Sequence, residues 1–234
     1  GVATVHQAVD HLAADAEAYQ HLAIAYAEEA VRAETSLAAQ FHRRAATLYH
    51  EKLADLSGAV SQYQALLKLE PKDEKAMAGL DTIYRNTDAY AELVQVLRHR
   101  ASLTAGVERR RELLGEIAQI QAEKLFDLQG AAATLRELLA LAPDDEPSFQ
   151  RLQSLLETLE AFESLAELYG AETRRLLEKR GREPLQKRLK ITFALARLYE
   201  ERLGARAQAV QLLQQLLSES AEPIEVVAYL DAGQ

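Results

Sequence analysis

Apolar residues recur along this chain with the spacing expected of helices that bury one face. In the stretch 74–86, Met77, Leu80, Ile83 and Tyr84 follow one another at helical intervals. Comparable patterns cover 39–53, 58–69 and 89–103. No run of alternating β-branched residues indicates a strand. The pattern therefore predicts an all-α chain.

Proline and aspartate mark the helix boundaries at equivalent places. Pro71 and Pro143 fall where one apolar pattern ends, because the residue before a proline is disfavoured in a helix. Asp73 and Asp145 come just before the next pattern, where a short carboxylate can accept the free N–H groups of the first turn. The two prolines and the two aspartates are separated by the same interval, which points to a 72-residue internal repeat.

Longer stretches repeat with the same spacing. Glu51–Ala59 (EKLADLSGA) recurs one period later as Glu123–Ala131 (EKLFDLQGA), and a third copy, Tyr199–Gly204 with Ala209, follows after one period and six further positions. The six extra residues fall in 179–184, whose glycine and proline predict a lengthened connection. Repetition on this scale predicts a solenoid, because a single helix pair cannot bury its apolar face alone and must stack on its neighbours.

Half of this period is about 36 residues, close to the roughly 34 of a tetratricopeptide helix pair. The small and large positions of that family's motif are matched by Ala46, Tyr49, Ala59, Tyr63, Leu66 and Pro71, then by Ile117, Ala118, Ala131, Leu135 and Pro143, and then by Leu195, Ala196, Tyr199, Ala209 and Pro223. The alternate pairs lack the small residue and the closing proline. The chain thus resembles the tetratricopeptide repeat (TPR) family over essentially its whole length, with a degenerate 72-residue double unit.

The resemblance implies an α-solenoid, a right-handed superhelix of TPR-like antiparallel helix pairs. We expect one repeat domain over 1–234, part of a longer protein, because the chain lacks an initial Met and stops inside a helical pattern. The predicted parts are a half-unit 1–37, pairs at about 39–73, 74–108, 111–145, 146–182 and 189–223, and an unpaired helix 224–231. That last helix would expose an apolar face available for self-association.

Composition and motifs argue against catalysis. With no cysteine in 234 residues, disulfide scaffolds, thiol catalysis and cysteine-ligated metals are excluded. The chain has no phosphate-binding glycine loop, no GxSxG nucleophile turn and no HExxH metal motif. No apolar run approaches the roughly 18 residues of a membrane span. We therefore expect a protein that is not an enzyme, needs no cofactor and has no membrane span.

Histidine is the remaining candidate metal ligand. Five of the six histidines lie in the first 50 residues, and His42 and His50 share a helix face. A metal site also needs convergent partners that orient the ligands, and the sequence singles none out. We expect no metal, while a pH-dependent contact through His42 or His50 stays open.

Charge is unevenly distributed in this acidic chain, whose net charge is −9. Residues 1–40 carry a local net charge of −5, and 174–190 carry +6. The basic stretch is either a solvated helix turn or a docking patch for an acidic partner. Nucleic acid is a poor candidate, because the whole chain is acidic and the basic stretch has no interleaved aromatic residues for base stacking.

The family resemblance also suggests where a partner would bind. In TPR proteins the first helix of each pair lines a concave groove in which ligand peptides lie. Carried over by position, this groove would present Arg43, Arg85, Asn86, Gln119 and Arg197 as partner-binding residues. The three arginines would favour a ligand with acidic groups. With Asn86 as its single asparagine, the chain cannot form the family's usual carboxylate clamp of paired asparagines.

These features predict a non-catalytic protein–protein interaction scaffold that binds another protein or an extended peptide in its groove. Two alternatives stay open: a regulatory helical-repeat domain of a larger enzyme, or a self-assembling structural array. The Ala-, Leu- and Arg-rich composition resembles bacterial scaffold proteins. A cytoplasmic location is the corresponding expectation.

Overall fold

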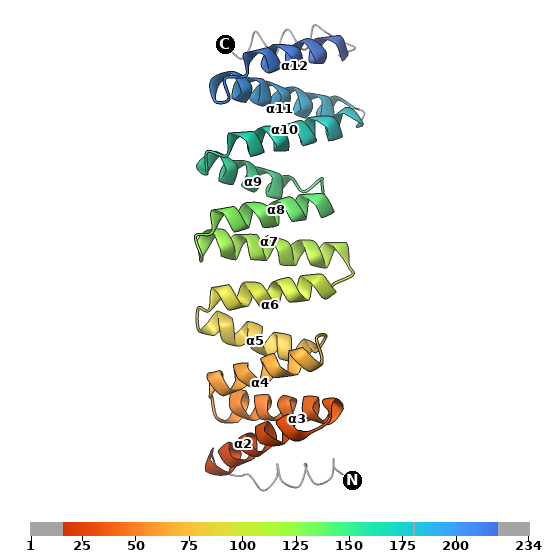
Figure 1. The fold of residues 1–234 in the computed structure, drawn as a ribbon. Helices are drawn as coiled ribbons and strands as arrows, with labels where there is room; N and C mark the ends of the chain where they lie inside the picture. The colour runs from red at the N-terminus through yellow and green to blue at the C-terminus, as the bar shows by residue number, and fades with distance from the viewer. Residues whose placement is uncertain (1–15, 180, 220–234) are drawn as a thin grey trace. The chain divides into compact units, whose positions relative to one another are not determined.

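The computed structural model describes residues 16–179 and 181–219, which form eleven α-helices, a short π-helical segment and no strand (Figure 1). The elements are α2 (Ala16–Arg32), α3 (Thr35–Thr47), η1 (Leu48–Lys52), α4 (Leu56–Leu69), α5 (Glu74–Asn86), α6 (Tyr90–Leu103), α7 (Val107–Glu123), α8 (Leu128–Leu141), α9 (Glu146–Thr158), α10 (Phe162–Leu177), α11 (Arg182–Glu201) and α12 (Arg206–Glu219). The predicted all-α class is confirmed. The predicted helix 224–231 lies outside the described residues.

The chain divides into two compact units, unit 1 (residues 1–134) and unit 2 (residues 135–234), with the boundary inside α8. Within unit 1, the helices from α2 to α7 each pack on the next helix in the chain. Within unit 2, α9 packs on α10, α10 on α11 and α11 on α12. Short turns join these neighbours, so consecutive helices run antiparallel within each unit (Figure 1). The hand of a superhelix stays a prediction.

The core of unit 1 is formed by the positions that the apolar pattern singled out. Met77, Leu80, Ile83 and Tyr84 of α5 are all buried, with exposed fractions between 1% and 6%. Small residues allow close packing of the helices, and Ala46 and Ala59 are both fully buried. In unit 2, Leu152, Leu156, Leu165, Leu195 and Leu216 are buried in the same way. The helical hydrophobic pattern thus identified the buried faces correctly.

Aspartates cap the helices as the sequence predicts. Asp73 Oδ1 accepts the backbone N–H of Ala76 at 2.7 Å, and Asp145 Oδ1 accepts that of Ser148 at 3.1 Å. Asp55 caps α4 in the same way, by accepting the N–H of Gly58 at 3.0 Å.

The turn between paired helices also repeats along the chain. Ala54, Phe126 and Gly204 adopt left-handed backbone conformations, with φ values of 51°, 53° and 61°. They are separated by the same intervals as the three sequence copies. In each case the following N–H reaches back six residues, as in the 2.8 Å bond from Asp127 N to Gln121 O. This left-handed turn therefore recurs at the positions where the three sequence copies align.

The connection before α11 differs from the expectation. The glycine and proline in 179–184 predict a lengthened loop and a fifth pair starting at 189, but α11 already begins at Arg182. Pro184 lies in the first turn of α11, where its missing N–H has no helical partner to lose. Part of the inserted segment therefore lengthens the helix to 20 residues.

None of the described helices is both long enough and apolar enough to cross a membrane.

Candidate partner-binding surface

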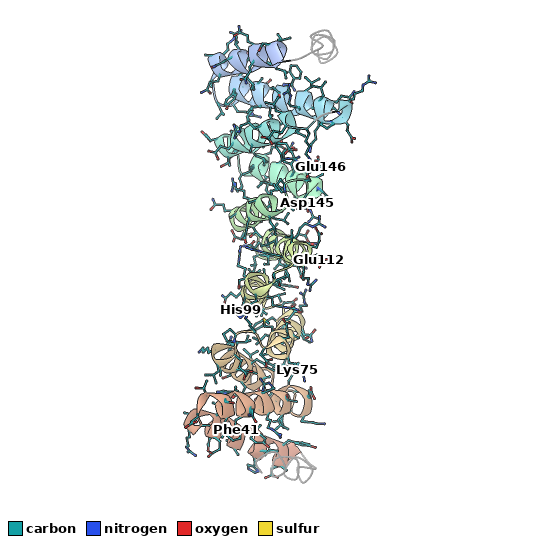
Figure 2. The ribbon with its side chains drawn as sticks, turned by 90° about the vertical axis from the view of Figure 1, so that its right-hand side faces the viewer. Phe41, Lys75, His99, Glu112, Asp145 and Glu146 are labelled. Atoms are coloured by element: carbon teal, nitrogen blue, oxygen red, sulfur yellow. The ribbon has the colours of Figure 1, made fainter. Side chains whose placement is uncertain are left out.

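The predicted partner-binding residues all lie on helices that open a pair. Arg43 is on α3, Arg85 and Asn86 are on α5, and Gln119 is on α7, all in unit 1, while Arg197 is on α11 in unit 2. Figure 2 places Lys75 of α5 and Glu112 of α7 on one side of unit 1, and His99 of α6 on the other. Two opening helices of unit 1, α5 and α7, therefore present these side chains on the same side.

Arg43 is already bound within the chain. Its Nε and Nη2 donate to Asp73 Oδ2 at 3.1 and 2.7 Å, and Nη2 also donates to Glu70. Burial of Asp73 acts to raise the pKa of its carboxyl, but the hydrogen bonds from Ala76 N–H and Arg43 outweigh it and leave that pKa below its ordinary value. Arg43, Glu70 and Asp73 line an open hollow of about 770 Å³ together with Pro71.

Arg85 links two successive opening helices. It donates to Asp81 Oδ1 from Nε at 3.0 Å and from Nη2 at 2.9 Å, and to Glu116 Oε1 of α7 at 2.6 Å. The hydrogen bond with Asp81 contributes most to raising the pKa of the Arg85 guanidinium. As with Arg43, the positive charge of Arg85 is therefore already paired with carboxylates of the chain, here Asp81 and Glu116.

Arg85 and Gln119 meet in one hollow of about 340 Å³ on unit 1. Gln119 Nε2 donates to Glu123 Oε2 at 3.1 Å. Tyr90 and Lys124 also line the hollow, and Lys124 Nζ lies 5.4 Å above the centre of the Tyr90 ring. Sequence reasoning did not place these two residues at the site. The sequence did hold a clue to Tyr90, because it occupies an aromatic position that recurs at Tyr19 and Phe162.

The other two predicted residues are more isolated. Asn86 is exposed at the end of α5. Arg197 is exposed, and its Nε lies 3.5 Å from Glu201 Oε1, one turn further along α11. The structure therefore brings Arg85 and Gln119 into one hollow, places Arg43 in another hollow of the same unit, and leaves Arg197 on unit 2.

The basic stretch 174–190 is partly neutralised by acids of unit 2. Arg175 donates to both carboxylate oxygens of Glu172 at 2.7 Å, and Lys187 Nζ donates to Glu172 Oε1 at 2.8 Å. Further contacts join Arg175 and Lys179 to Asp144, and Lys187 to Glu146, which is labelled in Figure 2.

Glu172 is the buried centre of this network, with a side chain only 6% exposed. Its burial opposes ionisation, but the hydrogen bonds from Arg175 and Lys187 hold the pKa of the Glu172 carboxyl below its ordinary value. Because a buried carboxylate left without its partners is strongly destabilising, these two cations have a structural role in unit 2. They are therefore poor candidates for a free docking patch.

Two histidines contact neighbouring polar groups. His42 Nδ1 lies 2.8 Å from Gln62 Oε1, and His50 Nδ1 lies 3.4 Å from the Tyr63 hydroxyl. Across residues 16–179 and 181–219, no group of three or more histidine or acidic side chains could hold a metal ion.

The sequence matches no protein-family model and no curated protein. Among solved structures, the chain is similar to the MamA protein, with 16% identity over 80% of this chain and 94% of that one and a TM-score of 0.33. It is similar to YrrB, described as "a TPR protein with an unusual peptide-binding site", with 14% identity, 82% and 91% coverage and a TM-score of 0.35. It is also similar to PilF of Pseudomonas aeruginosa, with 16% identity, 92% and 97% coverage and a TM-score of 0.35.

TM-scores of 0.33 to 0.35 do not indicate that this chain shares the function of those proteins. The fold class rests instead on the described helices, which form antiparallel pairs of tetratricopeptide-like length and order in each unit.

Proposed function

We propose that this chain is a non-catalytic protein-interaction scaffold, and that the opening helices of unit 1 bind another protein or an extended peptide. The observation that supports this most directly is the hollow shared by Arg85 of α5 and Gln119 of α7. Two successive opening helices contribute polar side chains to it, so one ligand can contact both repeats at once. Tyr90 and Ile120 add apolar surface to the same hollow.

The charges in this hollow favour a polar ligand over a strongly acidic one. Arg85 and Lys124 are balanced there by Glu116 and Glu123. An acidic group that approached Arg85 would compete with carboxylates already bound to the guanidinium, so the net gain from each new exposed pair is at most about 1 kcal/mol. We expect binding to depend only moderately on salt, with hydrogen bonds and apolar contact contributing most of the affinity.

Site-specific photo-crosslinking tests this surface even before the partner has been identified. A photoreactive residue in place of Asn86, which is exposed beside the hollow, should form crosslinks to the partner in the source cells. The same residue in place of Arg32, exposed on α2 and outside the hollows described, is the matched control. Crosslinks from position 32 but not from position 86 would place the partner on another surface.

Once a partner is known, the double substitution Arg85→Gln with Gln119→Ala should weaken its binding at least about tenfold, since both side chains line one hollow. Arg32→Gln should leave the affinity unchanged. Circular dichroism and thermal unfolding of each variant separate a loss of binding from a loss of fold. Equal affinity of the double variant and the parent would exclude this surface.

A further inference from the structure

Unit 2 contains a hollow of about 380 Å³ between α10, α11 and α12. This volume falls in the range of small-molecule sites, about 300–1,000 Å³. From α11 the hollow is lined by Arg188, Thr192, Leu195 and Tyr199. Arg197 is two residues from both Leu195 and Tyr199, and two residues correspond to about 200° around a helix. The hollow therefore lies on a different face of α11 from the predicted partner-binding residue.

The equivalent place in unit 1 is filled by a polar network. Arg98 Nη2 of α6 donates to Thr134 Oγ1 of α8 at 2.6 Å, and Thr134 donates to Gln121 Oε1 of α7 at 2.6 Å. These three side chains join three successive helices, and Thr134 is only 1% exposed. The Arg98 side chain thereby spans from α6 to α8, and Thr134 links it to α7.

In unit 2 the three network positions carry different residues. By the offset of the repeat, Gly170 is the counterpart of Arg98. The third copy follows the second by six residues more than one period. By that offset Tyr199 is the counterpart of Gln121, and Leu212 is the counterpart of Thr134. All three line the hollow. Because glycine has no side chain, nothing from this position of α10 can reach α12 as Arg98 reaches α8. The hollow therefore lies at the repeat position where the preceding copy carries the Arg98 side chain.

The lining combines apolar surface with positive charge. Leu177, Leu195 and Leu212 contribute apolar walls, and Arg174 contributes an exposed guanidinium group. No aspartate or glutamate is among the described residues that line the hollow, although the chain as a whole has a net charge of −9. Arg174 is exposed and makes no ion pair with the described residues, unlike the arginine that follows it. The hollow is thus suited to an anion attached to an apolar body.

Thr173 adds a hydrogen-bonding group to this lining. Its Oγ1 is buried and has no hydrogen-bond partner in the described part of the chain. Other helical threonines satisfy this atom locally, as Thr192 does by donating to the carbonyl of Arg188 at 2.8 Å. The counterpart of Thr173 in the preceding copy is Ala101, so the hydroxyl is present in the copy that has the hollow and absent from the one before it. A buried polar atom without a partner has capacity left for a ligand.

We propose that this hollow binds a small amphipathic carboxylic acid. The carboxylate pairs with Arg174 and accepts the hydroxyl of Thr173, while the apolar body lies along Leu177, Leu195 and Leu212 in the space left by Gly170. This is a small-molecule site separate from the proposed partner-binding surface of unit 1, and neither depends on the other.

Isothermal titration calorimetry with three simple probes tests the chemistry. Octanoate, which has both the carboxylate and the apolar chain, should bind with one site per chain. Octanol lacks the charge and acetate lacks the apolar body, so both should bind more weakly than octanoate. Octanol binding as tightly as octanoate would overturn the proposal, as would no detectable binding of octanoate at millimolar concentration. A leucine-terminated peptide that binds where octanoate does not would also overturn it, because the occupant would then be a partner chain.

Matched substitutions at one position test the location. Gly170→Leu fills the hollow without adding charge and should abolish octanoate binding. Gly170→Ala should preserve it, because a Cβ there meets only Arg174 Nη1 at 3.6 Å, an ordinary van der Waals distance. Arg174→Gln should weaken octanoate about two- to fivefold and leave octanol unaffected. All three changes suit an α-helix, so thermal unfolding should show folded proteins. Undiminished octanoate binding by the Gly170→Leu variant would exclude this site.

Discussion

Arg43 on α3 and Asp73 at the start of α5 are far apart in sequence, yet Arg43 Nη2 lies 2.7 Å from Asp73 Oδ2. The other oxygen of the same carboxylate accepts the N–H of Ala76 and so caps α5. Asp73 thus joins two successive opening helices while its side chain remains only 9% exposed. Arg43, which sequence reasoning assigned to partner binding, therefore also has a structural role in unit 1.

We predict that Arg43→Gln lowers the free energy of unfolding by about 1–2 kcal/mol, because it leaves a largely buried carboxylate with one partner fewer. Urea denaturation at neutral pH measures this change. The matched control is Arg32→Gln, whose ion pair with Glu29 is more than half exposed on both sides and should cost at most about 0.5 kcal/mol. Equal effects of the two substitutions would contradict the structural role of Arg43.

The ion pair between Arg43 and Asp73 also predicts how the stability of the protein changes at acidic pH. Since the pKa of Asp73 is lowered in the folded state, its stabilising effect is present above the ordinary aspartate pKa of about 3.9 and is lost as pH falls through the lower folded value. The free energy of unfolding should therefore fall steeply below about pH 4. In Arg43→Gln this fall should be shallower, because one of the groups that lower the pKa of Asp73 is gone. Parallel pH profiles for the two proteins would show that the pair is not formed.

Substitutions at the left-handed turn position should change stability in opposite directions in two copies of the repeat, at Phe126 and at Gly204. Phe126 has a φ of 53° and a side chain that is 80% exposed, so Phe126→Gly relieves backbone strain and loses little packing. We expect stabilisation of about 0.5–1 kcal/mol. Gly204→Ala should cost about 1 kcal/mol at a φ of 61°, although its Cβ would meet no atom within 4 Å. Thermal unfolding measures both, and a stabilising Gly204→Ala would argue against this turn geometry.

Gly79 of α5 packs directly against the ring of Tyr63 on α4. A Cβ on Gly79 would lie 2.5 Å from Tyr63 Cε2, inside van der Waals contact, and Tyr63 is 7% exposed. Gly79→Ala should therefore destabilise the protein by about 1–3 kcal/mol, despite the better helix propensity of alanine. Gly106→Ala is the control, because a Cβ there meets nothing within 4 Å. If chemical denaturation gave the same midpoint for both variants, the contact with Tyr63 would be looser than the structure shows.

Buried Tyr169 should lose its hydroxyl proton only at unusually high pH. Burial raises the pKa of its hydroxyl to about 12, so the folded protein keeps this proton when an unfolded chain would lose it near pH 10. Its contribution to stability is present below about pH 10 and is lost as pH rises toward 12. Absorbance titration at alkaline pH should show a tyrosine that ionises late, and Tyr169→Phe should remove it. An unchanged late phase in Tyr169→Phe would assign that phase to another tyrosine.

For the candidate sites, sequence reasoning identified positions but not partners. Repeat spacing placed Arg85 and Gln119 on opening helices, and the structure brings them into one hollow. The same spacing did not predict that Arg85 binds Glu116 on the next opening helix, because long side chains can pair in many ways across neighbouring helices. The basic stretch 174–190 is the clearest example: local counting gives +6, yet Arg175 and Lys187 contact acids that lie outside that window.

Local patterns in the sequence were enough to predict the helices, their buried faces and the repeat. These features depend on periodicity and on capping residues such as Asp73 and Asp145, which act within a few positions along the chain. Which charges are free, and where space remains between helices, depends instead on how the helices pack. The replacement of Arg98 by Gly170 is visible in the sequence. That it leaves a hollow depends on α10 and α12 packing on α11 without a bridging side chain, and on the buried hydroxyl of Thr173 that lines it.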